Sequence, residues 1–395
     1  MSSNFTDDLS GLMDGAEEAM VDIRRDLHQH PELAFDEVRT TSVISQRLRE
    51  LNWTIEECPT ETGAVATLDT GRPGKTVMIR ADIDGLPVLE ERDLSYRSVN
   101  DGTMHACGHD VHTAALLGVA DVLSRRREQL NGKFIALFQP AEEALGGARA
   151  MIDGGLFTNH HVDYVIGGHV TSLGPVGLVG ARPGIIMSEA TGFTVKIHGQ
   201  GGHGAMASEA GNVVLAVSAV APQLAAVVTG LTYEGTNCAC SAGIINAGTA
   251  DNVVPRTATL RGSLRTFLPE QRTAALARLE ALLAEVAAQY SVECSLHLEG
   301  HTPAVTNDAS VTQRFTASAG KVVDPTYVWE IPPVSPSDDV SEFLRLIPGC
   351  YAMIGGALED GTSGAHHSGE FAVSDSAVRV MASVLASAAV DLAQE

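Results

Sequence analysis

The chain has 395 residues, of which 44% are hydrophobic, a composition typical of a globular protein long enough to form two domains. Acidic residues outnumber basic ones by 49 to 26, which gives a formal net charge of −23. This charge argues against a nucleic acid or an anionic membrane as partner, because both attract basic surfaces. A small anionic substrate needs only local positive charge and stays compatible with the composition.

The N-terminal segment and the cysteines indicate a compartment. The first 20 residues are acidic and lack the hydrophobic core of a signal peptide. No apolar run approaches the roughly 20 residues that a membrane span requires. The six cysteines are scattered and form no C-x-x-C motif, as expected for free thiols in a reducing compartment. We therefore expect a cytoplasmic protein with no membrane association.

The chain begins with helices and then alternates between strands and helices. Apolar residues spaced three and four apart predict helices over 8–29 and 36–50. Short β-rich apolar runs follow, each long enough for a strand that is buried on both faces. Their alternation with helices predicts a mostly parallel sheet with helices on both faces. The predicted strands are 75–84, 132–143, 162–170 and 349–356, and the predicted helices are 110–128, 144–153, 308–319, 337–346 and 374–393.

The middle of the chain has a different order of elements. From about residue 186 the pattern is β-α-β-β-α-β, which is typical of a ferredoxin-like α+β domain. We therefore predict a discontinuous α/β domain, 1–184 and 301–395, with a second domain, 185–300, inserted into it. Gly and Pro in 180–184 and 299–303 favour hinges there. Within the insert the predicted strands are 190–199, 238–248, 257–267 and 291–300, and the predicted helices are 211–229 and 269–289.

Residues able to bind metal follow several of the predicted strands. The carboxyl ends of parallel strands meet at one rim of a sheet, so side chains distant in sequence can converge there. Each residue alone has a structural explanation, such as a capped turn, a solvated helix start or a small buried thiol. Their number at one rim favours a metal site. They are Asp82 and Asp84, the stretch "MHACGHDVH" at 104–112, Glu142 and Glu143, His169, and His366 and His367 in "GAHHSGEF".

This set of donors exceeds the needs of one ion. One thiol, several imidazoles and a carboxylate are more than a single tetrahedral site requires, so two ions sharing a bridging ligand are expected. Thiolate and imidazole suit zinc, while carboxylates also admit manganese or cobalt. Such a pair activates water and polarises a carbonyl, and an uncoordinated carboxylate can act as general base. The residues alone leave open whether Glu142 or Glu143 has that role.

A competing hypothesis makes Cys107 a nucleophile activated by His105 or His109. The local signatures of papain-like and caspase-like enzymes are absent. This hypothesis also assigns no role to Glu142, Glu143, His169 and His367, so we rank it below the metal site.

Motifs spread over nearly the whole chain resemble those of a known family. They are "RRDLHQHPELAFDE", "RADIDGLPVLE", "MHACGHDVHTAALLG", "FQPAEEALGGARAMIDGGLF", "GGHV", "GQGGHGAM", "NVVPRTATLRGSLRTF" and "HHSGEF", in this order. The chain resembles the aminoacylase/carboxypeptidase metallo-exopeptidases. It is most similar to their amidohydrolase branch, which includes hippurate hydrolases, N-acyl-amino-acid amidohydrolases and auxin-conjugate hydrolases.

The resemblance assigns roles to most residues of the rim. It implies two divalent ions, with zinc the first expectation and manganese, cobalt or nickel as alternatives. Glu142 would be the general base, and Asp84 would orient a ligand. Asp82 has no assigned role, and His105, His112 and His366 are expected to be structural or to support the ligands without binding metal. The implied metal ligands are Cys107 as the bridge, with His109, Glu143, His169 and His367.

The resemblance also implies that the inserted domain pairs with that of a second copy to form a homodimer. His203 would then reach the partner's active site and stabilise the oxyanion. Asn252 and Arg265 would hold the substrate carboxylate or carbonyl, a task that suits the planar guanidinium of arginine. Cys238 and Cys240 lie on one face of an apolar strand and are expected in the core.

The predicted reaction is hydrolysis of an N-acyl amino acid to a carboxylic acid and a free amino acid. Two rivals use the same site, namely hydrolysis of an N-carbamoyl amino acid and hydrolysis of a dipeptide. A third is a non-catalytic homologue that binds metal or peptide, since a fold does not secure a function.

Overall fold

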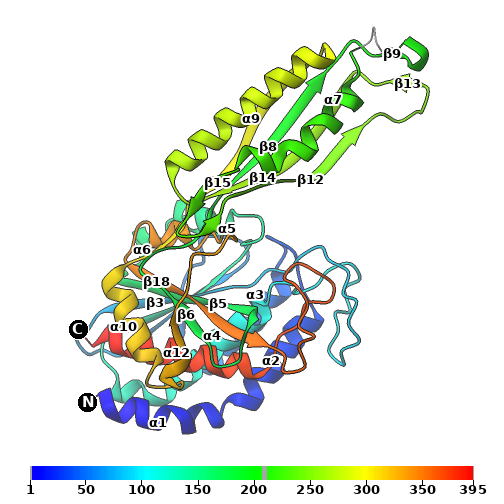
Figure 1. Cartoon of the computed structure of the whole chain (residues 1–395). Coiled ribbons are helices and arrows are strands. Elements are labelled where there is room, and N and C mark those ends of the chain that lie inside the picture. Colours follow the sequence, from blue (N-terminus) through cyan, green and yellow to red (C-terminus); the bar gives the residue numbers. More distant parts are fainter. Residues whose placement is uncertain (1, 207–210, 395) are drawn as a thin grey trace. The chain divides into compact units, whose positions relative to one another are not determined.

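The computed structural model describes residues 2–206 and 211–394, and the chain forms two compact units (Figure 1). The main unit comprises Met1–Gly184, Thr306–Ile331 and Asp339–Glu395. The inserted unit comprises Ile185–Val305 and Pro332–Asp338. The strands β7 (Gly184–Met187) and β16 (Val305–Asn307) lie where the chain passes between the units.

The main unit is built on an eight-stranded, largely parallel sheet. Its four central strands run parallel, and antiparallel pairs occur toward both edges. The strands are, in spatial order, β1 (Thr54–Ile55), β2 (Ala64–Asp69), β4 (Lys133–Gln139), β3 (Thr76–Asp82), β5 (Tyr164–Pro175), β18 (Gly349–Ala357), β6 (Val179–Ala181) and β17 (Val328–Glu330).

Helices cover both faces of this sheet. Alternate residues of β3 and β4, such as Val77 and Phe134, pack with α4 (His109–Arg126) and α12 (Ser376–Ala393), which lie side by side (Figure 1). Arg80 points to the other face, where Asp339 accepts hydrogen bonds from it and from the start of α5 (Gly147–Asp153). The other helices are α1 (Ser2–Asp14), α2 (Glu17–Gln29), α3 (Val38–Glu50), α6 (Leu156–Asn159), α10 (Ala309–Ala319) and α11 (Ser341–Leu344).

α12 is long and apolar enough to cross a membrane by length and composition alone. Most of it is buried inside the main unit, against α4 and the sheet. Its apolar character therefore matches its position in the core of the unit.

The inserted unit is a four-stranded antiparallel sheet with helices that pack against it. The sheet order is β12 (Ala239–Ala247), β14 (Thr257–Thr266), β8 (Glu189–His198) and β15 (Glu293–Thr302). The helices are α7 (Val213–Val220), α8 (Leu224–Val227) and α9 (Pro269–Tyr290). Two short antiparallel pairs complete the unit, β9 (Gly202–His203) with β13 (Val253–Val254), and β10 (Thr232–Tyr233) with β11 (Thr236–Asn237).

The predicted fold class, α/β with an inserted α+β part, is confirmed, but some elements differ. The segment 8–29 forms α1 and α2 rather than one helix, and the break falls at Gly15, a poor helix former. The segment 211–229 is interrupted by a 3₁₀ turn, Ala221–Gln223, that contains Pro222. The predicted helix over 337–346 shrinks to α11, because Asp339 bonds to the opposite strand and helix instead of starting a longer helix.

Candidate metal centre

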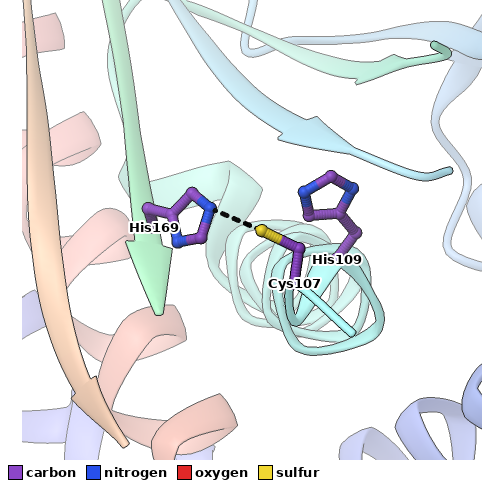
Figure 2. A group of neighbouring side chains, drawn as sticks. All are labelled: Cys107, His109 and His169. Atoms are coloured by element: carbon purple, nitrogen blue, oxygen red, sulfur yellow. Dashed lines mark hydrogen bonds between the residues drawn. The ribbon is translucent and has the colours of Figure 1, made fainter. Parts of the chain in front are cut away.

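The first residues of α4 and the turn before it form one side of the site. Gly108 precedes the helix with a φ of 92°, a left-handed conformation that favours glycine. A Cβ atom at this position would lie 2.3 Å from Cγ1 of Val170. The tight turn lets Cys107 and His109 approach β5, where Figure 2 shows the thiol next to the ring of His169.

Cys107, His109 and His169 form the first group of candidate ligands. The Sγ atom of Cys107 lies 3.4 Å from Nε2 of His169. The Nδ1 atom of His169 faces the Val170 carbonyl oxygen at 2.7 Å and must donate to it, so Nε2 carries a free lone pair. The Nδ1 atom of His109 likewise faces the backbone oxygen of Asp84 at 2.9 Å, and its Nε2 has no hydrogen-bond partner. Because Nδ1 is directed to a backbone oxygen in both rings, Nε2 is the nitrogen that each ring would present to a metal.

A second group contains Cys107, Glu143 and His367. The Nε2 atom of His367 lies 3.3 Å from Oε1 of Glu143, and this oxygen is buried without a hydrogen-bond partner. The backbone N–H of Glu143 donates to Oδ2 of Asp84 at 2.9 Å, so Asp84 supports both groups. Within each group the donor atoms lie within 4.8 Å of one another. The thiol common to both is therefore placed to bridge two cations.

The electrostatics of the site favour cations. Although burial lowers it, the pKa of His109 is raised to about 10 by the carboxylates of Asp82 and Asp84. Burial, together with Glu143 and Glu142, raises the pKa of the Cys107 thiol well above its usual range. A reactive nucleophilic cysteine needs the opposite shift, so the nucleophile hypothesis loses support. A divalent cation would coordinate Nε2 of His109 and the unbonded oxygen of Glu143, and its positive charge would offset the negative charge of the neighbouring carboxylates.

Glu142 is buried beside both groups and belongs to neither. Its Oε2 lies 4.0 Å from Nε2 of His109. The turn that presents it is strained, since Ala141 has a φ of 54°. The buried carboxylate of Glu37 stabilises this turn by accepting from the Ala141 N–H at 2.8 Å and from the hydroxyl of Thr62. Glu37 is a supporting residue that the sequence reasoning missed, because nothing local marks it.

The remaining histidines of these motifs have other surroundings. His112 uses both ring nitrogens within the protein, with Asp82 and with the backbone N–H of Val170. His366 accepts from the backbone N–H of Ser172, and its other nitrogen lies 3.8 Å from the thiol. His105 is buried with neither nitrogen bonded. None of the three has the arrangement of His109 or His169.

The motif "RRDLHQHPELAFDE" supplies a buried ion cluster behind the site. His28 lies between Asp110 and Glu90, at 3.0 and 3.1 Å. Arg24 also donates to Asp110, which follows the candidate ligand His109 directly. The two carboxylates come from distant segments, which the motif does not reveal.

The inserted unit carries the remaining predicted residues. His203 is exposed on β9 and pairs with Val253, next to Asn252. Arg265 lies near the end of β14 and donates to Ser337. β14 begins beside His198, the last residue of β8, so Arg265 is eight residues along the strand from that end, roughly 26 Å. His203 comes shortly after the end of β8, and Asn252 comes shortly before the start of β14, so both belong to the end of the sheet where these two strands meet the β9–β13 pair. The structure therefore brings His203 and Asn252 together and separates them from Arg265 within the unit.

Three comparisons show which known proteins the chain is similar to. The profile described as Peptidase family M20/M25/M40 matches residues 78–391. The chain is 33% identical over 373 residues to Thermostable carboxypeptidase 1 of Saccharolobus solfataricus, covering 92% of this chain and 93% of that protein. It is 34% identical over 372 residues to the N-acetylcysteine deacetylase of Bacillus subtilis, covering 94% and 96%. A solved structure of the Bacillus subtilis YXEP protein, described as a dinuclear metal binding peptidase, matches with a TM-score of 0.78 and 30% identity, covering 95% and 98%.

Proposed function

The chain belongs to peptidase family M20/M25/M40 and is a metal-dependent amidohydrolase, and from this premise we propose that it cleaves N-acyl amino acids into a carboxylic acid and a free amino acid. The observation that carries this proposal is the pair of ligand groups that share the Cys107 thiol, with the carboxylate of Glu142 beside them and outside both. A relative named for deacetylation of N-acetylcysteine supports the substrate class.

The geometry supports the proposed ligand roles. Cys107, His109 and His169 would hold one ion, and Cys107, Glu143 and His367 would hold the other. Two bound divalent ions supply Lewis acidity and lower the pKa of water towards roughly 7. The free lone pairs of the two imidazoles and the thiol favour zinc, with manganese, cobalt or nickel as alternatives.

Glu142 acts as the proton carrier. Its carboxylate takes the proton from the attacking water as the new carbon–oxygen bond forms at the amide carbonyl. It then delivers this proton to the amide nitrogen as the carbon–nitrogen bond breaks, which releases a neutral amine. Glu142 lies outside the two ligand groups that share the thiol, and its buried carboxylate is also within coordinating distance of His109 and Glu143, so it adjoins the site where the water would react.

The substrate is held from two chains. A substrate the size of an acyl amino acid is far shorter than β14, so His203 and Arg265 of one inserted unit cannot both contact it. We propose that Arg265 binds the carboxylate of the substrate in the site of its own chain. His203 and Asn252 would act on the site of a second copy. His203 would then stabilise the oxyanion that forms at the scissile carbonyl.

The surface of the inserted unit supports a homodimer. β12 is an edge strand of the sheet, and it exposes Ile244 and Ile245 at 45% and 47%. On α7, Leu215 is also exposed. An edge strand with apolar side chains is suited to pair with an identical strand. The six cysteines are unpaired, which supports a reducing compartment such as the cytoplasm for this dimer.

A hydrolysis panel tests the proposal. Protein loaded separately with zinc, manganese, cobalt and nickel is incubated with acetyl-, benzoyl-, indoleacetyl-, long-acyl and carbamoyl-amino acids and with dipeptides. We expect release of free amino acid from at least one acyl substrate, at a higher kcat/KM than from carbamoyl substrates and dipeptides. Preference for either of those would replace the proposal with that rival, and no cleavage under any loading would favour a metal-binding or peptide-binding role.

A further inference from the structure

Two buried side chains beside the metal centre have no part in the reaction proposed above. Asp82 ends β3, and His112 lies on α4 three residues after His109. The Oδ1 atom of Asp82 and the Nδ1 atom of His112 are 2.5 Å apart. The backbone N–H of Val170 on β5 donates to Nε2 of His112 at 2.9 Å. His112 therefore links three elements, each of which carries or adjoins a residue of the metal centre.

The direction of each hydrogen bond is determined by the backbone. The N–H of Val170 can only donate, so Nε2 of His112 must accept and carries no proton. The proton of the neutral ring is then on Nδ1 and is donated to Oδ1 of Asp82. Pairing of β3 with β5 ends at Arg80 and Gly167. His112 thus supplies an acceptor for the Val170 N–H beyond the last paired residues of these strands.

A second hydrogen bond, from Arg80, fixes the orientation of the Asp82 carboxylate. Its second carboxylate oxygen accepts from Nη1 of Arg80 at 2.7 Å. Arg80 is itself buried and donates to Gln139 and Asp339. The carboxylate thus has little freedom to rotate away from His112.

The ring of His112 also packs against both candidate ligand rings. Its centroid lies 4.7 Å from that of His169 and 5.4 Å from that of His109. In addition, both backbone groups of Val170 bond to histidines of the site: its carbonyl accepts from His169, and its N–H donates to His112. A shift of His112 would therefore move the backbone group that orients the His169 ring.

Asp82, His109 and His112 also satisfy the distances of a possible third ligand group. This alternative is disfavoured because both nitrogens of His112 already have protein partners. A metal ion at either nitrogen would break one of these two bonds.

We propose that Asp82 and His112 are positioning residues that hold His109 and His169 in the orientation required by the metal pair. This inference rests on the proposed metal centre and goes beyond it, because neither residue touches the metal or the substrate. Loss of supporting residues of this kind typically weakens metal binding about 10–100-fold.

The test measures metal binding directly in Asp82→Asn, His112→Leu and His112→Gln. Asparagine cannot accept from both Arg80 and His112, and leucine removes both bonds of the imidazole. Glutamine keeps one donor and one acceptor on a planar group. Val119→Ala, a buried change on α4 away from the site, is the matched control for lost stability. Zinc affinity and stoichiometry are measured by chelator competition, and the visible spectrum of the cobalt(II) form reports the ligand geometry.

We expect Asp82→Asn and His112→Leu to bind zinc about 10–100-fold more weakly, at unchanged stoichiometry and with an altered cobalt spectrum. His112→Gln should recover most of the affinity, and Val119→Ala should bind like the wild type. Wild-type affinity and spectrum in Asp82→Asn would overturn the inference, as would the loss of one ion per chain in His112→Gln. A wild-type protein that binds no metal would instead refute the proposed function itself.

Discussion

The Nε2 atom of His169 faces the thiol of Cys107 at 3.4 Å and carries no proton, because the other nitrogen of the ring donates to the Val170 carbonyl. Two potential ligand atoms that approach so closely inside the protein, with His109 beside them, make a candidate site for a cation. The same thiol lies within coordinating reach of Glu143 and His367, which makes it the common point of the site.

Substitutions of Glu142 and Glu143 are expected to have different effects on metal content and activity. Glu142→Gln removes the proton carrier and leaves every proposed ligand, so it should keep both metals and lose about 10²–10⁴-fold in kcat. Glu143→Gln removes a ligand and should lose metal content as well as activity. Metal analysis and initial rates on the two purified variants check this, and more than a tenth of wild-type activity in Glu142→Gln would contradict the role of Glu142.

Gly108 is expected to be sensitive to a single added methyl group. In Gly108→Ala the left-handed backbone becomes strained, and the new Cβ meets Val170. We expect the free energy of unfolding to fall by about 1–3 kcal/mol and zinc binding to weaken, because Cys107 and His109 flank this residue. Gly11→Ala is the control, since nothing lies near its added Cβ in α1 and the change should be neutral or stabilising. Thermal unfolding with and without zinc compares the two, and a Gly108→Ala protein as stable as Gly11→Ala would be inconsistent with the turn geometry.

The buried cluster around His28 predicts how stability depends on pH. Burial lowers the pKa of His28, but its bonds to Asp110 and Glu90 outweigh this and raise the pKa to about 9. The protonated ring therefore stabilises the folded state fully below its unfolded pKa of about 6.5. This contribution should be lost as the pH rises through about 9. Urea unfolding of wild type and His28→Gln from pH 6 to 10 should show their difference shrinking toward alkaline pH, and a difference that stays constant would exclude the charged bridge.

The proposed exchange of His203 between two copies can be tested by mixing variants. Glu142→Ala and His203→Ala should each lose most activity alone, the second by about 10²–10³-fold. In a mixed dimer one site keeps its own Glu142 and receives His203 from the other chain. Unfolding and refolding the two variants together should restore about a quarter of wild-type activity, because half of the random dimers are mixed and each has one intact site. Activity that stays at the level of the separate variants would contradict the exchange.

Much of the rim of the sheet could be predicted from the sequence. Strands buried on both faces appear as continuous apolar runs, and polar residues just after such runs must lie at the strand ends. That reasoning applies to Asp84 after β3 and to Glu142 and Glu143 after β4, and it needs no knowledge of side-chain contacts. His169 was expected at the end of its strand, but β5 continues beyond it to Pro175.

The supporting contacts could not be predicted in the same way. Asp82 and His112 meet from residues 30 positions apart, and Glu37 reaches Ala141 from 104 positions away. Nothing in a local pattern distinguishes a histidine with two protein partners from one with a free nitrogen. The short strands β1, β6 and β17 were also missed, because two or three residues carry too little periodicity to be recognised.

The most direct test is anomalous X-ray scattering from crystals of the zinc-loaded protein, recorded on both sides of the zinc absorption edge. We predict two zinc peaks per chain, both within coordinating distance of the Cys107 sulfur, one also bound by His109 and His169 and the other by Glu143 and His367. A single peak, or peaks that leave Cys107 uncoordinated, would contradict the bridged two-metal centre.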